Sequence, residues 1–451
     1  MPEAVERTLI VGVEITGRRR SAQPSLDPPV DVEESLEELA ALAESAGGQV
    51  AGRFKQARPA IDSATLLGSG KVAELKALVD ADEIDTVIFD HELTPTQLRN
   101  LERLLQVKVV DRTQLILDIF ARRARTSEGQ LQVELAQLSY LLPRLAGRGT
   151  QMSRLGGGIG TRGPGETQLE TDRRRIGSRI AKLKTEIARV RTTRGVQRAQ
   201  RQAVPLSTVG LVGYTNAGKS TLFNRLTGAD VLADAKMFAT LDPTVRQIRL
   251  PSHRRALLSD TVGFIRNLPT TLVDAFRATL EEVTAAVLLL HVVDITSAVA
   301  AEQTAHVMKV LAEIHAETTP QILVLNKCDA LLSADQPADL DAVTHRLLGE
   351  TARINKTKAA LISAKSGEGI PRLLELIDSL LVDDPVTLQR FRLPASEGRA
   401  LHVLHERAAV ISQDYVGDYC EVVAEVPESI RRRFAQFADE RKDSAGVRRK
   451  D

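Results

Sequence analysis

The chain of 451 residues is poor in aromatic residues and in cysteine. It has no Trp, and aromatic residues make up only 3% of it, so a binding surface built on stacked rings is not expected. Its two cysteines, Cys328 and Cys420, are too few for a disulfide framework. The sequence also lacks a CxxC pair or a Cys/His cluster with the spacing of a zinc site. These absences favour a reducing compartment.

Long apolar runs are missing as well. The longest apolar stretch, Ala285 to Leu290, is far shorter than the roughly 20 residues that cross a bilayer. The first residues, Met1 to Glu6, lack the basic and apolar pattern of a signal peptide. We therefore expect a cytoplasmic protein with no stable membrane insertion.

Charge is distributed unevenly along the chain, although the formal net charge is only +1. Residues 31–46 hold six acidic residues and no basic one, whereas residues 171–202 hold eleven Lys or Arg against two acids. With 43% apolar and 26% charged residues, the chain as a whole has the composition of a folded globular protein. The local asymmetry is therefore more informative than the total.

Residues 1–125 alternate between strand-like and helix-like stretches. The first strand-like stretch is Thr8–Thr16, and the last helix-like one is Thr113–Ala124. Such alternation predicts a small α/β domain with a largely parallel sheet.

Residues 126–203 change to a helical period. Leucines recur in steps of four and three from Leu131 to Leu145, and apolar positions repeat these steps from Leu169 to Val190. Between them, residues 147–165 contain eight glycines and three arginines, which excludes a helix there. The pattern predicts an antiparallel coiled-coil hairpin with a glycine-rich tip.

From residue 204 to 384, strands and helices alternate again over the length of one nucleotide-binding domain. Residues 385–451 follow as a separate part. There Leu388–Pro394 reads as a connector, and residues 395–440 read as a helix, two short strands and a helix. This part is expected to be a small α+β domain.

The clearest local motif is Gly213–Ser220, which matches G-x-x-x-x-G-K-[ST]. An apolar stretch, Thr208–Val212, precedes it as a strand, and Ser220–Leu226 follows it as a helix. Gly213 and Gly218 allow the backbone to turn its N–H groups onto phosphate oxygens at the positive end of that helix. The motif and its context predict a P-loop.

Two side chains of this motif carry most of the expected chemistry. Lys219 supplies a positive charge to the β- and γ-phosphates, and the Ser220 hydroxyl suits a Mg²⁺ ligand.

Base identity is indicated by a second motif, Asn326-Lys327-Cys328-Asp329, which follows the apolar strand Gln321–Leu325. A carboxylate at Asp329 can accept from both N1–H and the 2-amino group of guanine, a donor pair that adenine lacks. Asn326 is expected to brace the loop, and the stem of Lys327 to cover the base. The later Ser363-Ala364-Lys365 completes the pattern, with the Ala364 N–H expected to face the guanine O6.

Between these motifs lie the expected nucleotide-sensing segments. Asp260-Thr261-Val262-Gly263 fits a DxxG turn, in which Asp260 holds the water shell of Mg²⁺ and the Gly263 N–H meets the γ-phosphate. Thr240, in Phe238-Ala239-Thr240-Leu241-Asp242, is the preferred second hydroxyl ligand of Mg²⁺, and Thr244 is its rival.

Phe264 stands directly after DxxG, where many signalling GTPases have a water-positioning Gln. Phe cannot orient an attacking water by hydrogen bonding. It is either a hydrophobic plug in a switch loop, or a sign that hydrolysis needs a group from elsewhere, and the two readings are compatible.

The order of these motifs resembles the translational GTPase-like superclass of P-loop proteins. Together with Gly163–Arg174 (GPGETQLETDRR) and Gly213–Asn216, it is similar to the HflX family of ribosome-associated GTPases. The resemblance covers most of the chain, including Leu67–Lys71, and is weakest at residues 1–30 and after 385. The resemblance implies GTP hydrolysis, a cytoplasmic location and binding to the large (50S) ribosomal subunit and its RNA. It further implies a role in splitting or rescuing ribosomes under stress, or in assembling the large subunit.

The resulting expectation is a multidomain α/β protein with a Ras-like P-loop GTPase domain, a monomer off the ribosome, with GTP and Mg²⁺ as ligands. The expected catalytic residues are Lys219, Thr240 and Gly263, and the expected metal ligands are Ser220 and Thr240. The expected GTP-binding residues are Gly213, Tyr214, Thr215, Asn216, Ala217, Gly218, Lys219, Ser220, Thr221, Phe238, Ala239, Thr240, Leu241, Asp242, Asp260, Thr261, Val262, Gly263, Asn326, Lys327, Asp329, Ser363, Ala364 and Lys365.

The basic hairpin is interpreted as an RNA-binding element, with contacts expected from Arg148, Arg154, Arg162, Arg173 and Arg174. The alternative is a GTP-operated switch whose hairpin binds a protein. An RNA-modifying enzyme would need a cysteine or cofactor motif, and none is visible.

A second glycine-rich segment, Gly68-Ser69-Gly70-Lys71, lies in the N-terminal part. Some members of the family are reported to bind ATP through this part of the chain. The segment lacks an earlier glycine and has Val72 where a P-loop has Ser or Thr, so a helix-opening turn is preferred over a second nucleotide site.

Overall fold

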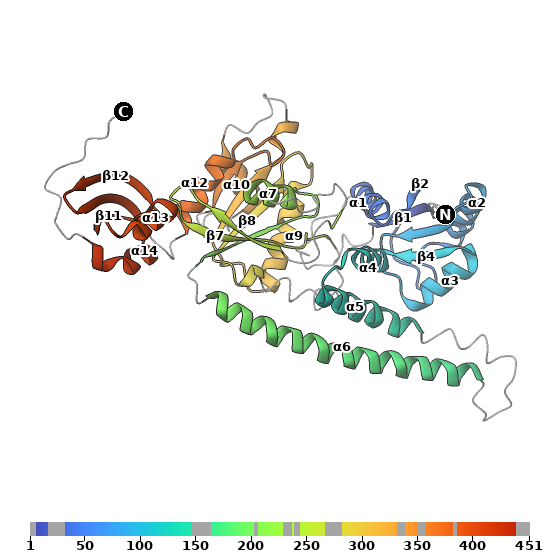
Figure 1. Cartoon of the computed structure of the whole chain (residues 1–451). Helices are drawn as coiled ribbons and strands as arrows, with labels where there is room; N and C mark the ends of the chain where they lie inside the picture. Colours follow the sequence, from blue (N-terminus) through green and yellow to red (C-terminus); the bar gives the residue numbers. More distant parts are fainter. Residues whose placement is uncertain are drawn as a thin grey trace. The chain divides into compact units, whose positions relative to one another are not determined.

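The chain forms two compact units in the computed structural model, which is drawn in Figure 1. The first unit comprises Met1–Gly195, Leu232–Pro243 and Val262–Glu281, and the second comprises Val196–Val231, Thr244–Thr261 and Glu282–Asp451. The structure describes residues 6–16, 32–145, 164–202, 206–228, 237–238, 244–266, 282–331, 339–349, 357–381 and 386–438.

The N-terminal part of the first unit contains a four-stranded, fully parallel sheet in the order β2-β1-β3-β4. Its strands are β1 (Arg7–Ile15), β2 (Gln49–Arg58), β3 (Thr86–Phe89) and β4 (Lys108–Asp111). The central strands β1 and β3 are almost wholly buried, as expected for a parallel sheet covered on both faces. The predicted small α/β domain with a parallel sheet is confirmed.

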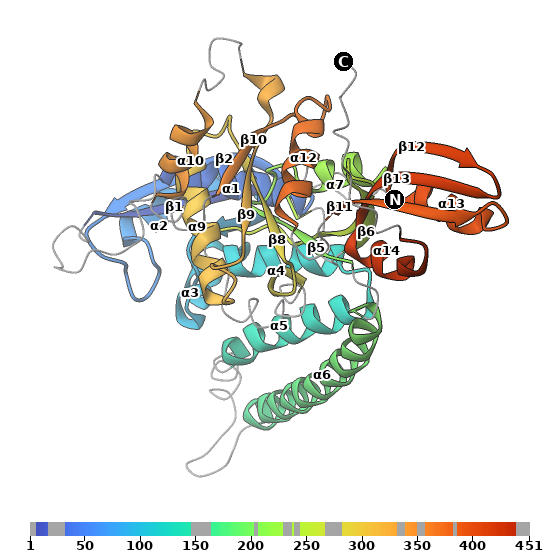
Figure 2. The ribbon, with the colours of Figure 1, turned by 90° about the vertical axis from the view of Figure 1, so that its left-hand side faces the viewer.

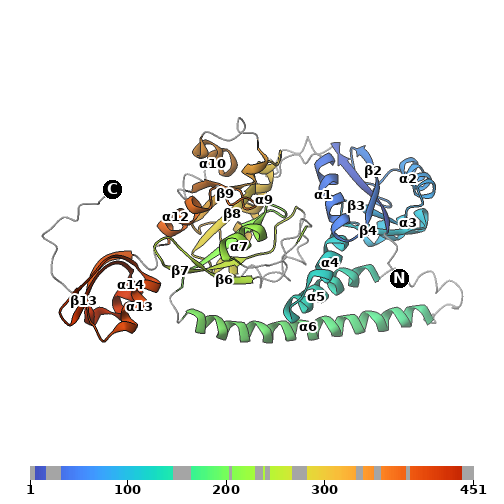
Figure 3. The same cartoon turned by 45° about the horizontal axis from the view of Figure 1, so that its top comes forward.

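Four helices cover this sheet: α1 (Val32–Ser45), α2 (Ser69–Ala81), α3 (Pro95–Leu105) and α4 (Arg112–Arg123). Figure 3 shows α2 and α3 on one face of the sheet and α1 and α4 on the other. α2 begins directly after Gly68, which is its N-cap, so the glycine-rich segment does open a helix.

The predicted hairpin helices are α5 (Ser127–Leu145) and α6 (Pro164–Gln202), which lie side by side in Figures 1 and 2. Arg179 of α6 donates from Nε and Nη2 to the two carboxylate oxygens of Glu134 of α5, each at 2.6 Å. A bidentate pair of this kind fixes the register of the two helices.

Two details of the hairpin differ from expectation. Pro164 and Gly165, which belong to the stretch predicted to be non-helical, open α6, because proline is well suited to the first helical turn. In α5 the leucine series is only half-buried, whereas Val133, Ala136 and Tyr140 are buried, and α5 packs against α4. The glycine-rich segment 146–163 lies outside the described residues.

The second unit contains a six-stranded sheet in the order β10-β9-β8-β5-β7-β6, in which only β6 runs antiparallel to its neighbour. Its strands are β5 (Thr208–Gly213), β6 (Thr244–Arg249), β7 (Arg255–Asp260), β8 (Leu288–Asp294), β9 (Gln321–Asn326) and β10 (Lys358–Leu361). The helices of this part are α7 (Lys219–Thr227), α9 (Ala300–Glu313), α10 (Leu340–Leu348) and α12 (Ile370–Leu380). The carboxyl ends of the parallel strands meet at one edge, where ligands of such folds bind.

The C-terminal part differs from the prediction at Leu388–Pro394. This stretch is not a connector but belongs to a strand, β11 (Val386–Pro394), which pairs antiparallel with β13 (Tyr419–Pro427). Phe391 and Leu393 alternate with exposed neighbours and are fully buried. The remaining elements are β12 (Ala409–Val416), α13 (Gly398–Arg407) and α14 (Glu428–Arg433), and the sheet order is β11-β13-β12.

Among the described helices, none combines the length and the apolar composition that a membrane span requires.

Candidate GTP-binding site

The loop between β5 and α7 has the backbone of a phosphate-binding turn. Gly213 has φ +147°, and a Cβ there would lie 2.3 Å from the carbonyl oxygen of Val292 on the neighbouring strand. Gly218 has φ +95°, and its Cβ would lie 2.2 Å from the Nδ2 atom of Asn326. Any other residue at either position would collide with the surrounding chain, so both glycines are needed for this path.

α7 begins at Lys219 with no side-chain cap and no acidic residue in its first turn. Its first N–H groups therefore point toward the loop without an internal carboxylate, which suits an anion. The Lys219 ammonium group lies over the same turn, where it donates to the carbonyls of Gly213 at 3.0 Å and Tyr214 at 2.7 Å. Burial lowers the pKa of Lys219 to about 8, while the charge of Asp260 opposes this shift.

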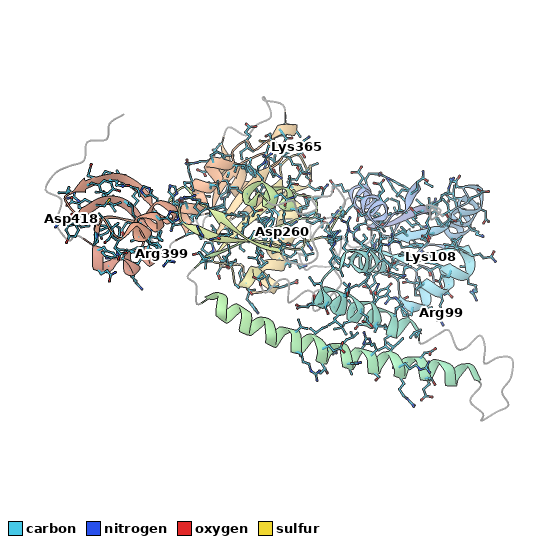
Figure 4. All side chains as sticks on the ribbon, in the orientation of Figure 1. Arg99, Lys108, Asp260, Lys365, Arg399 and Asp418 are labelled. Atoms are coloured by element: carbon cyan, nitrogen blue, oxygen red, sulfur yellow. The ribbon has the colours of Figure 1, made fainter. Side chains whose placement is uncertain are left out.

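Ser220, one of the two expected metal ligands, lies in the first turn of α7, and Asp260 is the last residue of β7. The Ser220 hydroxyl donates to a carboxylate oxygen of Asp260 at 2.9 Å, and Asp260 is fully buried. Figure 4 labels Asp260 in this domain. A hydroxyl beside a buried carboxylate is a hard-oxygen donor set that fits Mg²⁺ and would leave positions for phosphate oxygens. Among the described residues, no cluster of three or more His, Cys, Asp or Glu side chains offers an alternative metal site.

Asn326 joins the phosphate-binding loop to the expected base-binding loop. Its Nδ2 donates to the Ala217 carbonyl at 2.8 Å, and its Oδ1 accepts from the Ala364 N–H at 2.9 Å. The predicted bracing role of Asn326 therefore has a defined geometry. It also means that, in this structure, the Ala364 N–H is held by Asn326 rather than turned toward a base, contrary to the expectation for this group.

The other residues of the NKxD turn are arranged in different ways. Lys327 adopts a left-handed conformation with φ +70°, and its ammonium group pairs with the Asp294 carboxylate at 2.6 Å. Asp329 is exposed at the turn, as a base-binding carboxylate must be, whereas Cys328 is buried. Burial, followed by the neighbouring Glu368, raises the pKa of the Cys328 thiol, which is consistent with a packing role.

The loop after β10 holds the last predicted motif. Ser363 and Ala364 are buried, and Lys365, labelled in Figure 4, is exposed. The Ser363 hydroxyl oxygen accepts from the Ser366 N–H at 3.0 Å, and the Gly367 N–H donates to the Ser363 carbonyl at 2.8 Å, so the loop is internally hydrogen-bonded.

The second unit thus brings together the P-loop, Asp260, the NKxD turn and the 363–365 loop. Two contributors were not predicted from the sequence: Asp294, which partners Lys327, and Arg225, which contacts the 363–365 loop. An Asp directly after an apolar strand is a recognisable signal for the first. A basic residue in the last turn of a helix is too common to single out the second.

Several expected residues of the nucleotide-sensing segments belong to the first unit. Phe238 is 3% exposed, and its ring centroid lies 4.5 Å from that of Phe120 on α4 in an edge-to-face pair. The N–H of Met237 donates to the Ser45 hydroxyl at 3.0 Å. Both contacts place the start of the segment that contains Thr240 against the N-terminal α/β part.

The residues after DxxG are anchored in the same unit. Val262, Phe264 and Ile265 are buried. Arg266 lies 3.7 Å from the Glu38 carboxylate, which also pairs with the buried Arg112. The burial of Phe264 agrees with its interpretation as a hydrophobic plug in a switch loop.

Ala239, Thr240, Leu241 and Asp242 lie outside the described residues. Thr244, the rival to Thr240, is the first residue of β6 and is in register with Asp260 across the β6–β7 pair.

Of the expected RNA contacts, Arg148, Arg154 and Arg162 also lie outside the described residues, whereas Arg173 and Arg174 are exposed on α6.

Three family models match consecutive parts of the chain. Residues 33–121 match "GTP-binding GTPase N-terminal", residues 123–201 match "GTP-binding GTPase Middle Region", and residues 208–327 match "50S ribosome-binding GTPase". A GTPase HflX of Caldanaerobacter subterraneus is 48% identical over 90% of this chain and 90% of its own length. The chain belongs to the HflX family of GTPases. It is therefore a GTPase, as the motifs predicted.

A second relative agrees with this family. The GTPase HflX of Escherichia coli is 45% identical over 84% of this chain and 86% of its own length. Among solved structures, a GTP-binding protein from Sulfolobus solfataricus in complex with GDP is 26% identical and covers 83% of this chain and 98% of its own, with a TM-score of 0.45.

Proposed function

We propose that the chain hydrolyses GTP with Mg²⁺ at the site described above and that the bound nucleotide controls its attachment to the large ribosomal subunit. The bridge made by Asn326 carries the first part of this proposal, because one side chain ties the phosphate-binding loop to the loop expected to read the base. Because the loops expected at the phosphate end and at the base end are linked, the site is suited to recognise both ends of GTP together.

In this proposal Lys219 neutralises the β- and γ-phosphates, exchanging the two loop carbonyls it now contacts for phosphate oxygens. Ser220 and Thr240 would ligate Mg²⁺, and Asp260 would hold its water shell. The metal would neutralise charge that develops on the phosphates during transfer. Gly263 would meet the γ-phosphate through its N–H.

Nucleotide control is supported by the neighbours of the sensing segments. Phe238, two residues before Thr240, packs against Phe120 of α4, and Arg266, three residues after Gly263, pairs with Glu38 of α1. A change in the conformation of these segments between the GTP and GDP states would therefore alter their packing on the N-terminal part, and through it the hairpin that follows.

Attachment to the large subunit is supported by the basic face of α6. Arg173 and Arg174 are exposed, and their segment holds eleven basic residues against two acids. Arg179 is not available for such a role, because Glu134 binds it in a bidentate pair. A rigid helix that carries an excess of arginines suits the phosphate backbone of folded RNA. We further infer a cytoplasmic role in splitting or rescuing ribosomes under stress, or in assembling the large subunit.

The test is co-sedimentation of the full chain with purified large subunits at several salt concentrations. The double variant Arg173→Gln/Arg174→Gln should bind more weakly and with a shallower salt dependence, by about one unit of log–log slope for each phosphate that is no longer neutralised. Arg346→Gln, an exposed arginine on α10, is the matched control.

An unchanged affinity and slope in the double variant would remove these two arginines from the interface. If large subunits bind wild-type protein no better than unrelated RNA does, the alternative of a protein partner for the hairpin would be favoured.

A further inference from the structure

Arg225 lies in the last turn of α7, the helix whose first residue is Lys219. Its Nε donates to the Ala364 carbonyl at 3.2 Å, and its Nη2 donates to the Lys365 carbonyl. Six residues of helix, roughly 9 Å, separate Arg225 from Lys219. The same helix therefore touches the expected phosphate end of the site with its first turn and the expected base end with its last.

The contact between Arg225 and the Ala364 carbonyl defines the orientation of the peptide group that joins Ala364 to Lys365. In a trans peptide the C=O and the following N–H point in opposite directions. Because the Ala364 carbonyl points toward Arg225, the Lys365 N–H points away from α7. Within the described part of the chain, this N–H has no hydrogen-bond partner.

The preceding peptide is held from the other side. The Ala364 N–H donates to Asn326 Oδ1 at 2.9 Å, so Ala364 is fixed at its N–H by the NKxD turn and at its C=O by α7. Of the two N–H groups in this part of the loop, only that of Lys365 remains available to a ligand. This assigns to Lys365 the role that the sequence suggested for Ala364.

The chemistry of arginine fits this task. Its planar guanidinium donates to two successive carbonyls at once, which the single ammonium group of a lysine cannot do with the same geometry. Gly367, with φ +95°, lies beside the guanidinium, since a Cβ there would be in van der Waals contact with Arg225 Cζ at 3.7 Å. The hydrogen bond from the Gly367 N–H to the Ser363 carbonyl, at 2.8 Å, closes the loop that contains Ala364 and Lys365.

We propose that Arg225 is a positioning residue that aims the Lys365 N–H at the O6 atom of guanine and so sets the preference of the site for a 6-oxo purine. Arg225 touches neither the nucleotide nor the metal in this account, and it acts through the backbone of the 363–365 loop. The inference rests on the proposed placement of the base between Asp329 and this loop.

Two guanosine triphosphate analogues separate the two ends of the base. 6-Thio-GTP keeps the donors at N1 and N2 but replaces O6 with sulfur, a poor acceptor. ITP keeps O6 and N1–H but lacks the 2-amino group expected to contact Asp329. Affinities of the full chain for GTP, 6-thio-GTP and ITP, measured by displacement of a fluorescent GDP, therefore report the two contacts independently.

Arg225→Ala is expected to bind GTP about tenfold more weakly, which corresponds to about 1.4 kcal/mol. Its preference for GTP over 6-thio-GTP should fall toward one, while its preference for GTP over ITP stays at the wild-type value. Arg225→Lys should be intermediate, and Arg346→Ala should match the wild type. Because Arg225 is largely exposed, its removal should leave the melting temperature close to that of the wild type.

The inference is overturned if Arg225→Ala keeps the wild-type preference for GTP over 6-thio-GTP, or if both preferences fall together. The second result would mean that the helix as a whole has shifted. A wild-type protein that does not distinguish GTP from 6-thio-GTP would instead refute the placement of the base at this loop, and the inference with it. Asp329→Ala provides the reciprocal check, since it should lose the preference over ITP and keep the preference over 6-thio-GTP.

Discussion

Replacing Gly218 with alanine tests the bridge between the phosphate end and the base end of the site. The added methyl group would lie 2.2 Å from Asn326 Nδ2, so the Asn326 side chain must move. That movement breaks its hydrogen bonds to the Ala217 carbonyl and from the Ala364 N–H. Without nucleotide, the Asn326 side chain can move aside in the variant. The nucleotide-bound site needs the bridge that Asn326 makes, so we expect the variant to lose free energy of nucleotide binding.

The size of the effect follows from the two hydrogen bonds that the nucleotide-bound site needs. Each is worth about 1 kcal/mol, and both are buried. The strain of alanine at the left-handed φ of Gly218 is present with and without nucleotide, so it lowers stability and not affinity. The sum of about 2 kcal/mol corresponds to roughly a thirtyfold loss of affinity.

The assay is displacement of a fluorescent GDP from the full chain at fixed Mg²⁺, for wild type, Gly218→Ala and Gly70→Ala. Gly70 is the matched control, because a Cβ there meets no heavy atom within 4 Å. Its variant should bind as the wild type does. If Gly218→Ala binds GDP within about threefold of the wild type, less than 1 kcal/mol has been lost and the bridge does not support binding.

Two further outcomes follow from the same site, and a third follows from the buried His291 on β8. Asp329→Asn should shift the base preference from GTP toward xanthosine triphosphate, because the side-chain amide can donate to the carbonyl that xanthine has at C2; unchanged selectivity in a competition assay would argue against Asp329. Burial lowers the pKa of Lys219 to about 8, and a bound phosphate should restore its positive charge. GDP binding should therefore take up a proton, and the affinity for GDP should weaken as the pH rises through about 8. Calorimetry in buffers of different ionisation enthalpy can detect the proton uptake. Burial lowers the pKa of His291 from 6.5 to about 4, so the unfolded chain gains this proton first as the pH falls. The contribution of His291 to the free energy of unfolding should therefore be complete above about pH 6.5 and fall by up to about 3 kcal/mol toward pH 4. In His291→Leu the melting temperature should depend less on pH over that range.

The sequence predicted most of the site because its parts are contiguous motifs attached to strand ends. Gly213–Ser220 and Asn326–Asp329 each follow an apolar strand, and a parallel sheet necessarily brings such ends to one edge. Alternating strand-like and helix-like stretches predicted the N-terminal parallel sheet, and the four-and-three spacing of apolar residues predicted the two long hairpin helices.

What the sequence did not predict depends on contacts between distant residues. The Phe238–Phe120 pair and the Arg225–Ala364 contact join residues more than one hundred positions apart, and neither has a local pattern. The strand β11 resembles a connector in sequence, because its alternating apolar residues are interrupted by arginines on the exposed face.

In α5 the leucine repeat is visible in the sequence, but the face that is most buried carries Val133, Ala136 and Tyr140 instead. α5 also packs against α4, a contact that the period of the hairpin itself does not reveal.

The central claim is that the nucleotide bound at the P-loop controls attachment to the large ribosomal subunit. The most direct measurement is the affinity of the full wild-type chain for purified large subunits in the presence of a non-hydrolysable GTP analogue and, separately, of GDP. We predict tight binding with the GTP analogue and clearly weaker binding with GDP at the same salt concentration. Equal affinities in the two nucleotide states would contradict the account.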